Sequence, residues 1–165
     1  MKKLFIILIA VAFAVPTFAQ QKFGHIDSSA LLELMPEKKK AEGELESFAK
    51  EFETALQDMA KEYEGKIQAF QAGEKSMVET VRNTKMREIA DLERRIQEFQ
   101  QQAQEEIGKK EQEVLTPIID KARKAIDDVA KEKGYTYVFD SSLGVLLYAD
   151  DSEDIMADVK TKLGL

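Results

Sequence analysis

The residues best suited to catalysis are the single histidine, His25, and nearby Asp27. On an extended strand, residues two positions apart point to the same side, so the imidazole and the carboxylate could form the orienting pair of a hydrolase. Such a pair needs a nucleophile, and in a chain without cysteine that would be a serine. No serine carries the flanking glycines of a nucleophile elbow. We therefore predict a structural histidine, no catalytic residues and no enzyme activity.

Residues 150–154 form an acidic cluster that could be interpreted as a calcium site. The cluster lacks the alternating acidic order and the trailing glutamate of a calcium-binding loop. Acidic residues just before an apolar helix instead favour capping of that helix. The sequence also has no two-histidine metal spacing and no glycine-rich phosphate loop. We predict no metal, no nucleotide and no other cofactor.

The first 19 residues have the pattern of a secretory signal peptide. Lys2 and Lys3 precede an apolar run from Leu4 to Val15, and small residues end at Ala19. A retained membrane anchor is the alternative, but the run is shorter than the roughly 20 residues that span a bilayer. We predict export and cleavage after Ala19.

Charge narrows the range of partners for the exported chain. The whole sequence has a formal net charge of −7, and loss of Lys2 and Lys3 would make it more acidic. An acidic surface repels phosphate backbones, so nucleic acid is not expected as a partner. With 33% charged residues and no tryptophan, little of the chain can be globular core.

Two long helices dominate the middle of the chain. In residues 37–72, apolar residues recur every three or four positions, which predicts one helix with an apolar seam: Leu45, Phe48, Phe52, Leu56, Met59, Tyr63, Ile67 and Phe70. Residues 71–75 contain Gly73 and predict a break. Ser76 and Glu79 then have the spacing of a capping box, which predicts the start of a second helix.

The second helix is expected to run to Lys133, because apolar spacing continues that far and Gly134 can adopt a left-handed end. Pro117 lies within it and could kink or stop the helix; the continued spacing favours a kink. This helix is longer than the first. In an antiparallel hairpin, residues 114–133 therefore have no partner on the first helix and must pack against another part of the chain. We predict a hairpin arm over residues 37–113, with its tip near 71–80, and a body made of residues 20–36 and 114–165.

The body is predicted to contain three short strands, residues 22–27, 135–140 and 145–149, with the last two joined as a hairpin. Short helices are expected over residues 29–35 and around Ile155, Met156, Val159 and Leu163. Three short strands are too few for an independent sheet. Open edges and apolar faces predict that several copies merge their strands. The fold class is α+β, mostly helical, with a small β-barrel shared between chains and long antiparallel helical-hairpin (coiled-coil) arms.

The order of these segments resembles the Skp/OmpH family of periplasmic chaperones over essentially the whole mature chain. The specific residues are the early KFGHID strand, LTPIIDKARKAI at residues 115–126, YTYVF at 135–139 and LYAD at 147–150. The resemblance implies a periplasmic homotrimer with a central barrel and three arms around a cavity. The cavity would hold unfolded outer-membrane proteins without nucleotide until they reach the outer-membrane assembly machinery.

The resemblance and the apolar strands together assign candidate surfaces. Oligomerisation is expected to use Phe23, Ile26, Tyr137, Val138, Phe139, Val145, Leu146, Leu147 and Tyr148. Candidate client-binding residues flank the tip: Phe70, Met77, Val81 and Met86. Tip packing is the open alternative for the methionines. Small side chains along the first helix, such as Ala49 and Ala60, could add weak contacts with clients.

Two departures from the family pattern bear on its partners. Familiar members have basic arms suited to anionic lipid and lipopolysaccharide, whereas acidic side chains outnumber basic ones in residues 37–113, so lipid binding along the arm is not expected. A weak membrane contact is confined to the tip, through Lys75, Arg82, Lys85 and Arg87. Met156 replaces a frequent threonine, with a small effect on helix capping expected. The alternative function is a non-catalytic coiled-coil spacer or adaptor of the cell envelope.

Overall fold

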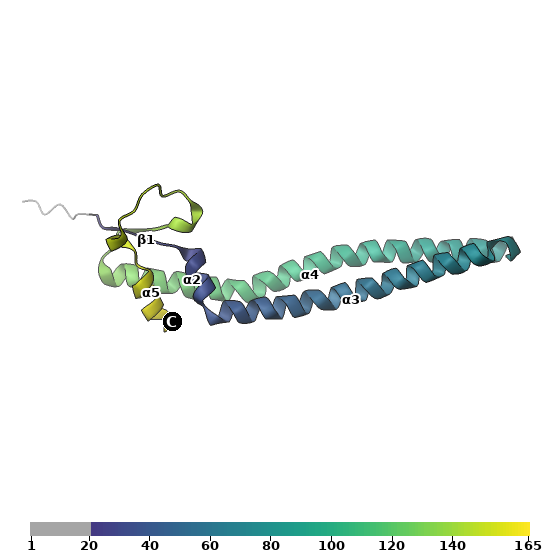
Figure 1. Ribbon diagram of the computed structural model, residues 1–165, viewed down its shortest axis with the longest axis horizontal. Coiled ribbons are helices and arrows are strands. Elements are labelled where there is room, and N and C mark those ends of the chain that lie inside the picture. The colour runs from purple at the N-terminus through teal and green to yellow at the C-terminus, as the bar shows by residue number, and fades with distance from the viewer. Residues whose placement is uncertain (1–20) are drawn as a thin grey trace, which may run out of the picture.

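The computed structural model describes residues 21–165, and the predicted signal peptide lies outside the described residues. Figure 1 shows a small body from which two long helices project side by side. The chain forms β1 (Phe23–Ile26) and α2 (Ser28–Leu34) in the body and leaves it along α3 (Pro36–Gly73). It turns through η1 (Glu74–Ser76) and returns along α4 (Glu79–Lys133).

The remaining elements close the body. After α4 come β2 (Tyr137–Asp140) and the short 3-10 helices η2 (Ser141–Leu143) and η3 (Asp151–Glu153), and the chain ends with α5 (Met156–Leu163). The mostly helical α+β prediction is therefore confirmed, although the sheet is smaller than expected.

Local sequence explains where the first helices begin. Asp27 caps α2, because its Oδ1 accepts a hydrogen bond from the Ala30 amide at 2.8 Å. Met35 is extended, and Pro36 then opens α3. Proline suits that first position because its missing N–H would have had no partner there. Pro36 therefore starts the long helix.

The turn at the end of the arm corrects one prediction. Ser76 lies in η1, and its hydroxyl donates to the Gly73 carbonyl oxygen at 2.9 Å. The residue before α4 is Val78, whose side chain offers no cap. The expected capping box is therefore wrong, because Ser76 lies two residues before the N-cap position and belongs to the preceding turn.

The long second helix ends as its sequence predicts. It runs through Pro117 without stopping and terminates at Gly134, which adopts φ 72°. The Gly134 amide donates back to carbonyls of the last turn. The left-handed conformation that glycine tolerates thus turns the chain toward β2.

The body core lies where α2, α4, α5 and the sheet meet. Five side chains are almost fully buried, namely Ile26, Leu31, Met35, Ile155 and Val159. On α4, alanines 122 and 125 are also buried, and their small side chains let the neighbouring elements approach closely. The other elements of the body therefore pack against the C-terminal end of α4.

The sheet differs from the prediction in its pairing. In the described residues, β1 and β2 form a two-stranded parallel sheet in which Phe23 pairs with Tyr137 and Ile26 with Asp140. Residues 145–149 are not a strand, so the expected hairpin with residues 135–140 is wrong. The Asp140 carboxylate accepts from the Ser142 amide at 3.0 Å and starts η2, which turns the chain away from β2. The shared barrel requires other chains and stays a prediction.

Candidate interaction surfaces

The outer face of the sheet carries three aromatic rings. Phe23, Tyr137 and Phe139 lie together with ring centroids 5.9 to 6.5 Å apart, and each side chain is 43% to 54% exposed. Strand alternation turns the intervening Gly24 and Val138 toward the core. Ile26 is 2% exposed in the core of its own chain and supports this surface from behind.

A second group of exposed apolar side chains follows β2 in the sequence. In residues 143–148, Leu143, Val145, Leu147 and Tyr148 are 68% to 100% exposed, with Leu147 entirely so. Leu146 is half-buried. Exposure of several large apolar side chains in one short segment is unfavourable in water. Together with the outer face of the sheet, these residues form what we call the body patch.

One edge of the small sheet is open within the described chain. β1 lies between β2 and a bridge to Asp154, where the Ile155 amide donates to the His25 carbonyl oxygen at 3.0 Å. β2 has no such neighbour on its outer side among residues 21–165. Its outer edge can therefore accept a further strand.

The candidate catalytic pair does not assemble. His25 Nε2 lies 3.2 Å from the Asp150 carbonyl oxygen, and the Asp27 carboxylate is occupied in capping α2. Residues 21–165 contain no cluster of three or more side chains suited to a metal ion. None of the helices in this part of the chain is long and apolar enough to cross a membrane.

At the tip, the structure separates the candidate client-binding residues. Val81 and Met86 are 43% and 53% exposed, whereas Phe70 and Met77 are half-buried. Met77 packs so closely over Gly73 that an added Cβ there would lie 2.6 Å from its Cε. Met77 therefore belongs to tip packing. Val78, at 66% exposed, is a further apolar side chain at the tip that was not among the candidates.

The basic residues predicted at the tip lie around this apolar group. Lys75 and Arg87 are exposed, and Arg82 and Lys85 are half-buried. None of the four forms an ion pair within the described residues. The tip thus carries basic side chains together with exposed apolar ones, and Glu74 and Glu79 lie in the same stretch.

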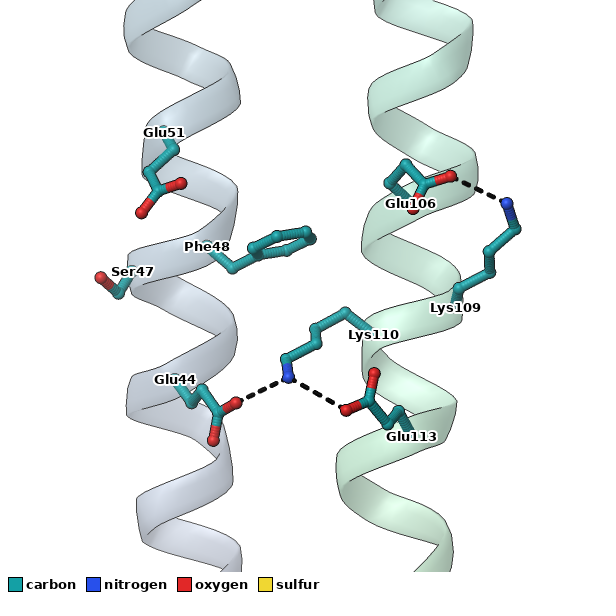
Figure 2. A pocket seen from close by; sticks show the side chains of 8 residues that line it. All are labelled: Glu44, Ser47, Phe48, Glu51, Glu106, Lys109, Lys110 and Glu113. Atoms are coloured by element: carbon teal, nitrogen blue, oxygen red, sulfur yellow. Dashed lines mark hydrogen bonds and ion pairs between the residues drawn. The ribbon is translucent and has the colours of Figure 1, made fainter.

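Near the base of the arm, charged residues from both helices line an open pocket of about 730 Å³. Figure 2 shows Lys110 of α4 between two carboxylates, with its Nζ 2.7 Å from Glu44 Oε1 of α3 and 3.3 Å from Glu113 Oε1. The hydrogen bond from Lys110 lowers the pKa of Glu44, and the bonds to Glu44 and Glu113 raise the pKa of Lys110.

This ion-pair pocket escaped sequence reasoning because it depends on the register between two helices. Phe48 points toward α4 in the same pocket. Glu44 and Lys110 are far apart in sequence, and they meet because of the alignment of α3 with α4 near the base of the arm. The same register brings Phe52 and Phe99 together, with ring centroids 5.8 Å apart.

Comparison with known proteins decides the family. Residues 22–163 match the family described as outer membrane protein (OmpH-like). The chain belongs to this family. The match covers all the helices and strands described above, as the sequence resemblance led us to expect.

A solved structure shares the fold of this OmpH-like chain. It is that of a candidate OmpH-like outer membrane chaperone from Caulobacter crescentus CB15, with a TM-score of 0.75 and 15% sequence identity. The alignment covers 88% of the present chain and 85% of that one. None of the curated proteins matches the sequence.

Proposed function

We propose that this OmpH-like protein is a periplasmic holdase chaperone. In this proposal three copies join through their bodies, and the arms surround a cavity that holds unfolded outer-membrane proteins without nucleotide. Clients are protected from aggregation there until they are released to the outer-membrane assembly machinery. Family membership supports the class of function.

The observation that carries the proposal is the half-covered apolar seam of the projecting arm. Two helices cannot enclose a seam on all sides, so Phe48, Leu56, Ile67 and Phe99 remain half-buried in the described chain. Half-covered apolar side chains give weak contacts with little dependence on client sequence. Several arms around one cavity would multiply such contacts through effective concentration.

The body patch supports assembly of several copies. Leu147 and Tyr148 are 100% and 83% exposed and make an exported monomer prone to nonspecific association. The open edge of β2 offers backbone groups beside this patch. A second copy whose residues 145–149 pair with that edge would cover both features, which supports a barrel shared between chains.

The function is tested by diluting a urea-unfolded outer-membrane β-barrel into buffer with residues 20–165 of this protein and no nucleotide. Light scattering should fall in proportion to added protein and saturate near three chains per client. Unchanged scattering, with the protein shown to be folded by circular dichroism, would exclude a holdase and favour the envelope spacer.

A further inference from the structure

The arm has two flanks of different chemistry. On either side of the apolar seam, α3 and α4 leave an open furrow, and one of these furrows is the ion-pair pocket of Figure 2. The other is a groove of about 770 Å³, to which both helices contribute apolar side chains. Its members include Phe52, Leu56, Ala60, Ile96, Ala103 and Ile107.

Helix geometry places these furrows on opposite flanks. At about 100° per residue, Glu44, Ser47 and Glu51 lie on one side of the α3 seam, and Ala49 and Ala60 lie on the other. The first three line the ion-pair pocket, whereas the two alanines line the apolar groove.

Glutamines supply the polar groups of the apolar groove. Gln57 is held by Glu53, with its Nε2 3.2 Å from Glu53 Oε1. Gln100 and Gln104 also line the groove, and within residues 21–165 neither side chain makes a hydrogen bond. A primary amide both donates and accepts, so it can pair with either backbone group of another polypeptide.

We propose that this groove, which we call the amide flank, is where the arm binds an extended, apolar segment of an unfolded polypeptide. The inference rests on the proposed function and specifies the surface that faces the client. Alanine, leucine and isoleucine side chains contact the apolar residues of the segment, and the amides of Gln100 and Gln104 pair with its exposed backbone.

Charge argues against other occupants of the amide flank. Acidic side chains outnumber basic ones over residues 37–113, so a second arm and an anionic membrane would both be repelled. Of the residues that line the groove, Glu53 is charged and the others are apolar or glutamine. Client segments free of acidic side chains are therefore favoured over acidic ones.

Two matched substitutions test the assignment. Ala60→Glu places a carboxylate in the amide flank, and Ser47→Glu places one in the opposite furrow. Both positions are exposed on α3, and each has a glutamate four residues later, so the cost to the helix is similar. The measurement is the Kd of full-length mature protein for a fluorescently labelled, urea-unfolded outer-membrane β-barrel.

The expected result is that Ala60→Glu weakens binding about tenfold, because it forces a charge against apolar client side chains, whereas Ser47→Glu changes the Kd less than about twofold. Equal effects of the two substitutions would overturn the inference. Failure of the unsubstituted protein to bind would instead refute the proposed function. The two failures are therefore distinguishable.

A photo-crosslinking amino acid at Gln100 gives a second readout that does not depend on affinity. It should form adducts with the client, whereas the same group at Lys109, on the ion-pair flank, should form few. Adducts between two arms in the absence of client would assign the groove to a second copy of this chain and overturn the inference.

Discussion

At the level of single residues, Gly134 is the position where backbone conformation matters most. Its φ of 72° lies in the left-handed region, and an alanine there would be strained by about 1 kcal/mol. Gly134→Ala should therefore lower the free energy of unfolding by about that amount in urea denaturation. Gly43 is a matched control inside α3, with open space around it, and Gly43→Ala should stabilise the helix by up to about 1 kcal/mol. If Gly134→Ala and Gly43→Ala changed the free energy of unfolding in the same direction, this explanation would be wrong.

The Glu44–Lys110 pair predicts a pH dependence with a defined sign. Because the pKa of Glu44 is lowered in the folded chain, its contribution is present above the ordinary carboxyl pKa and is lost as the pH falls through the lowered value. Because the pKa of Lys110 is raised, the contribution from that side is full below the ordinary lysine pKa and is lost as the pH rises through the raised value.

The lowering of the Glu44 pKa can be measured by NMR titration of its side-chain carboxyl carbon. Its midpoint should rise toward the ordinary glutamate value in Lys110→Met, since the hydrogen bond from lysine is then absent. The matched control is Lys61→Met, which removes an exposed lysine elsewhere on the arm. The pair is exposed, so its effect on stability should be small. An unchanged midpoint in Lys110→Met would contradict the assigned cause.

At the level of elements, the close approach of α4 to the rest of the body depends on small side chains. Ala122 is 5% exposed in the core. Ala122→Leu should destabilise the body by about 1–3 kcal/mol, because the added atoms have no space. Ala90→Leu, at an exposed position of the same helix, is the control and should have little effect in thermal unfolding. Similar melting temperatures for the two variants would show that the body can repack.

The helices could be predicted because their signals are local. Apolar spacing defines the seams, and a glycine after the last apolar position, Gly134, marks the end of α4. The S-x-x-E pattern at Ser76 failed because a serine hydroxyl can bond to the preceding turn as readily as to the following helix. Sequence pattern does not distinguish these two partners.

Strands and pairings were harder to predict because they depend on distant partners. The apolar run of residues 145–149 has strand composition, but no neighbouring strand exists for it within the described chain. The parallel pairing of β1 with β2 was missed for the same reason. The ion-pair pocket and the amide flank depend on the register between α3 and α4, which sequence spacing on either helix alone does not define.

At the level of the whole molecule, the body patch predicts how assembly can be disrupted without loss of fold. Leu147 and Tyr148 are exposed and contribute nothing to the core of their own chain, so L147D with Y148S should give folded monomers. Sedimentation velocity should show the loss of oligomer, and circular dichroism should remain unchanged. Val138 is less suitable for this test, because it packs against the core.

The control for that experiment is Gln71→Asp, an exposed change near the far end of the arm. It should leave the oligomer intact. If the folded L147D/Y148S monomer still suppresses client aggregation as well as the unsubstituted protein, the cavity mechanism is wrong. An intact oligomer in the double variant would instead show that assembly uses another surface.

The parallel pairing of β1 and β2 also has a consequence for the order of folding. Lys22 and Thr136, which hydrogen-bond beside the two strands, are 114 positions apart. Closing so long a loop directly is costly in entropy, and distant pairings slow folding. If α3 and α4 pair first, starting at the tip, Glu37 and Lys121 are already together at the base of the arm. The loop that must then close to pair β1 with β2 is much shorter. We therefore predict that the arm forms first and the body closes from it, so that substitutions that loosen the tip should slow folding of the body more than they lower its stability.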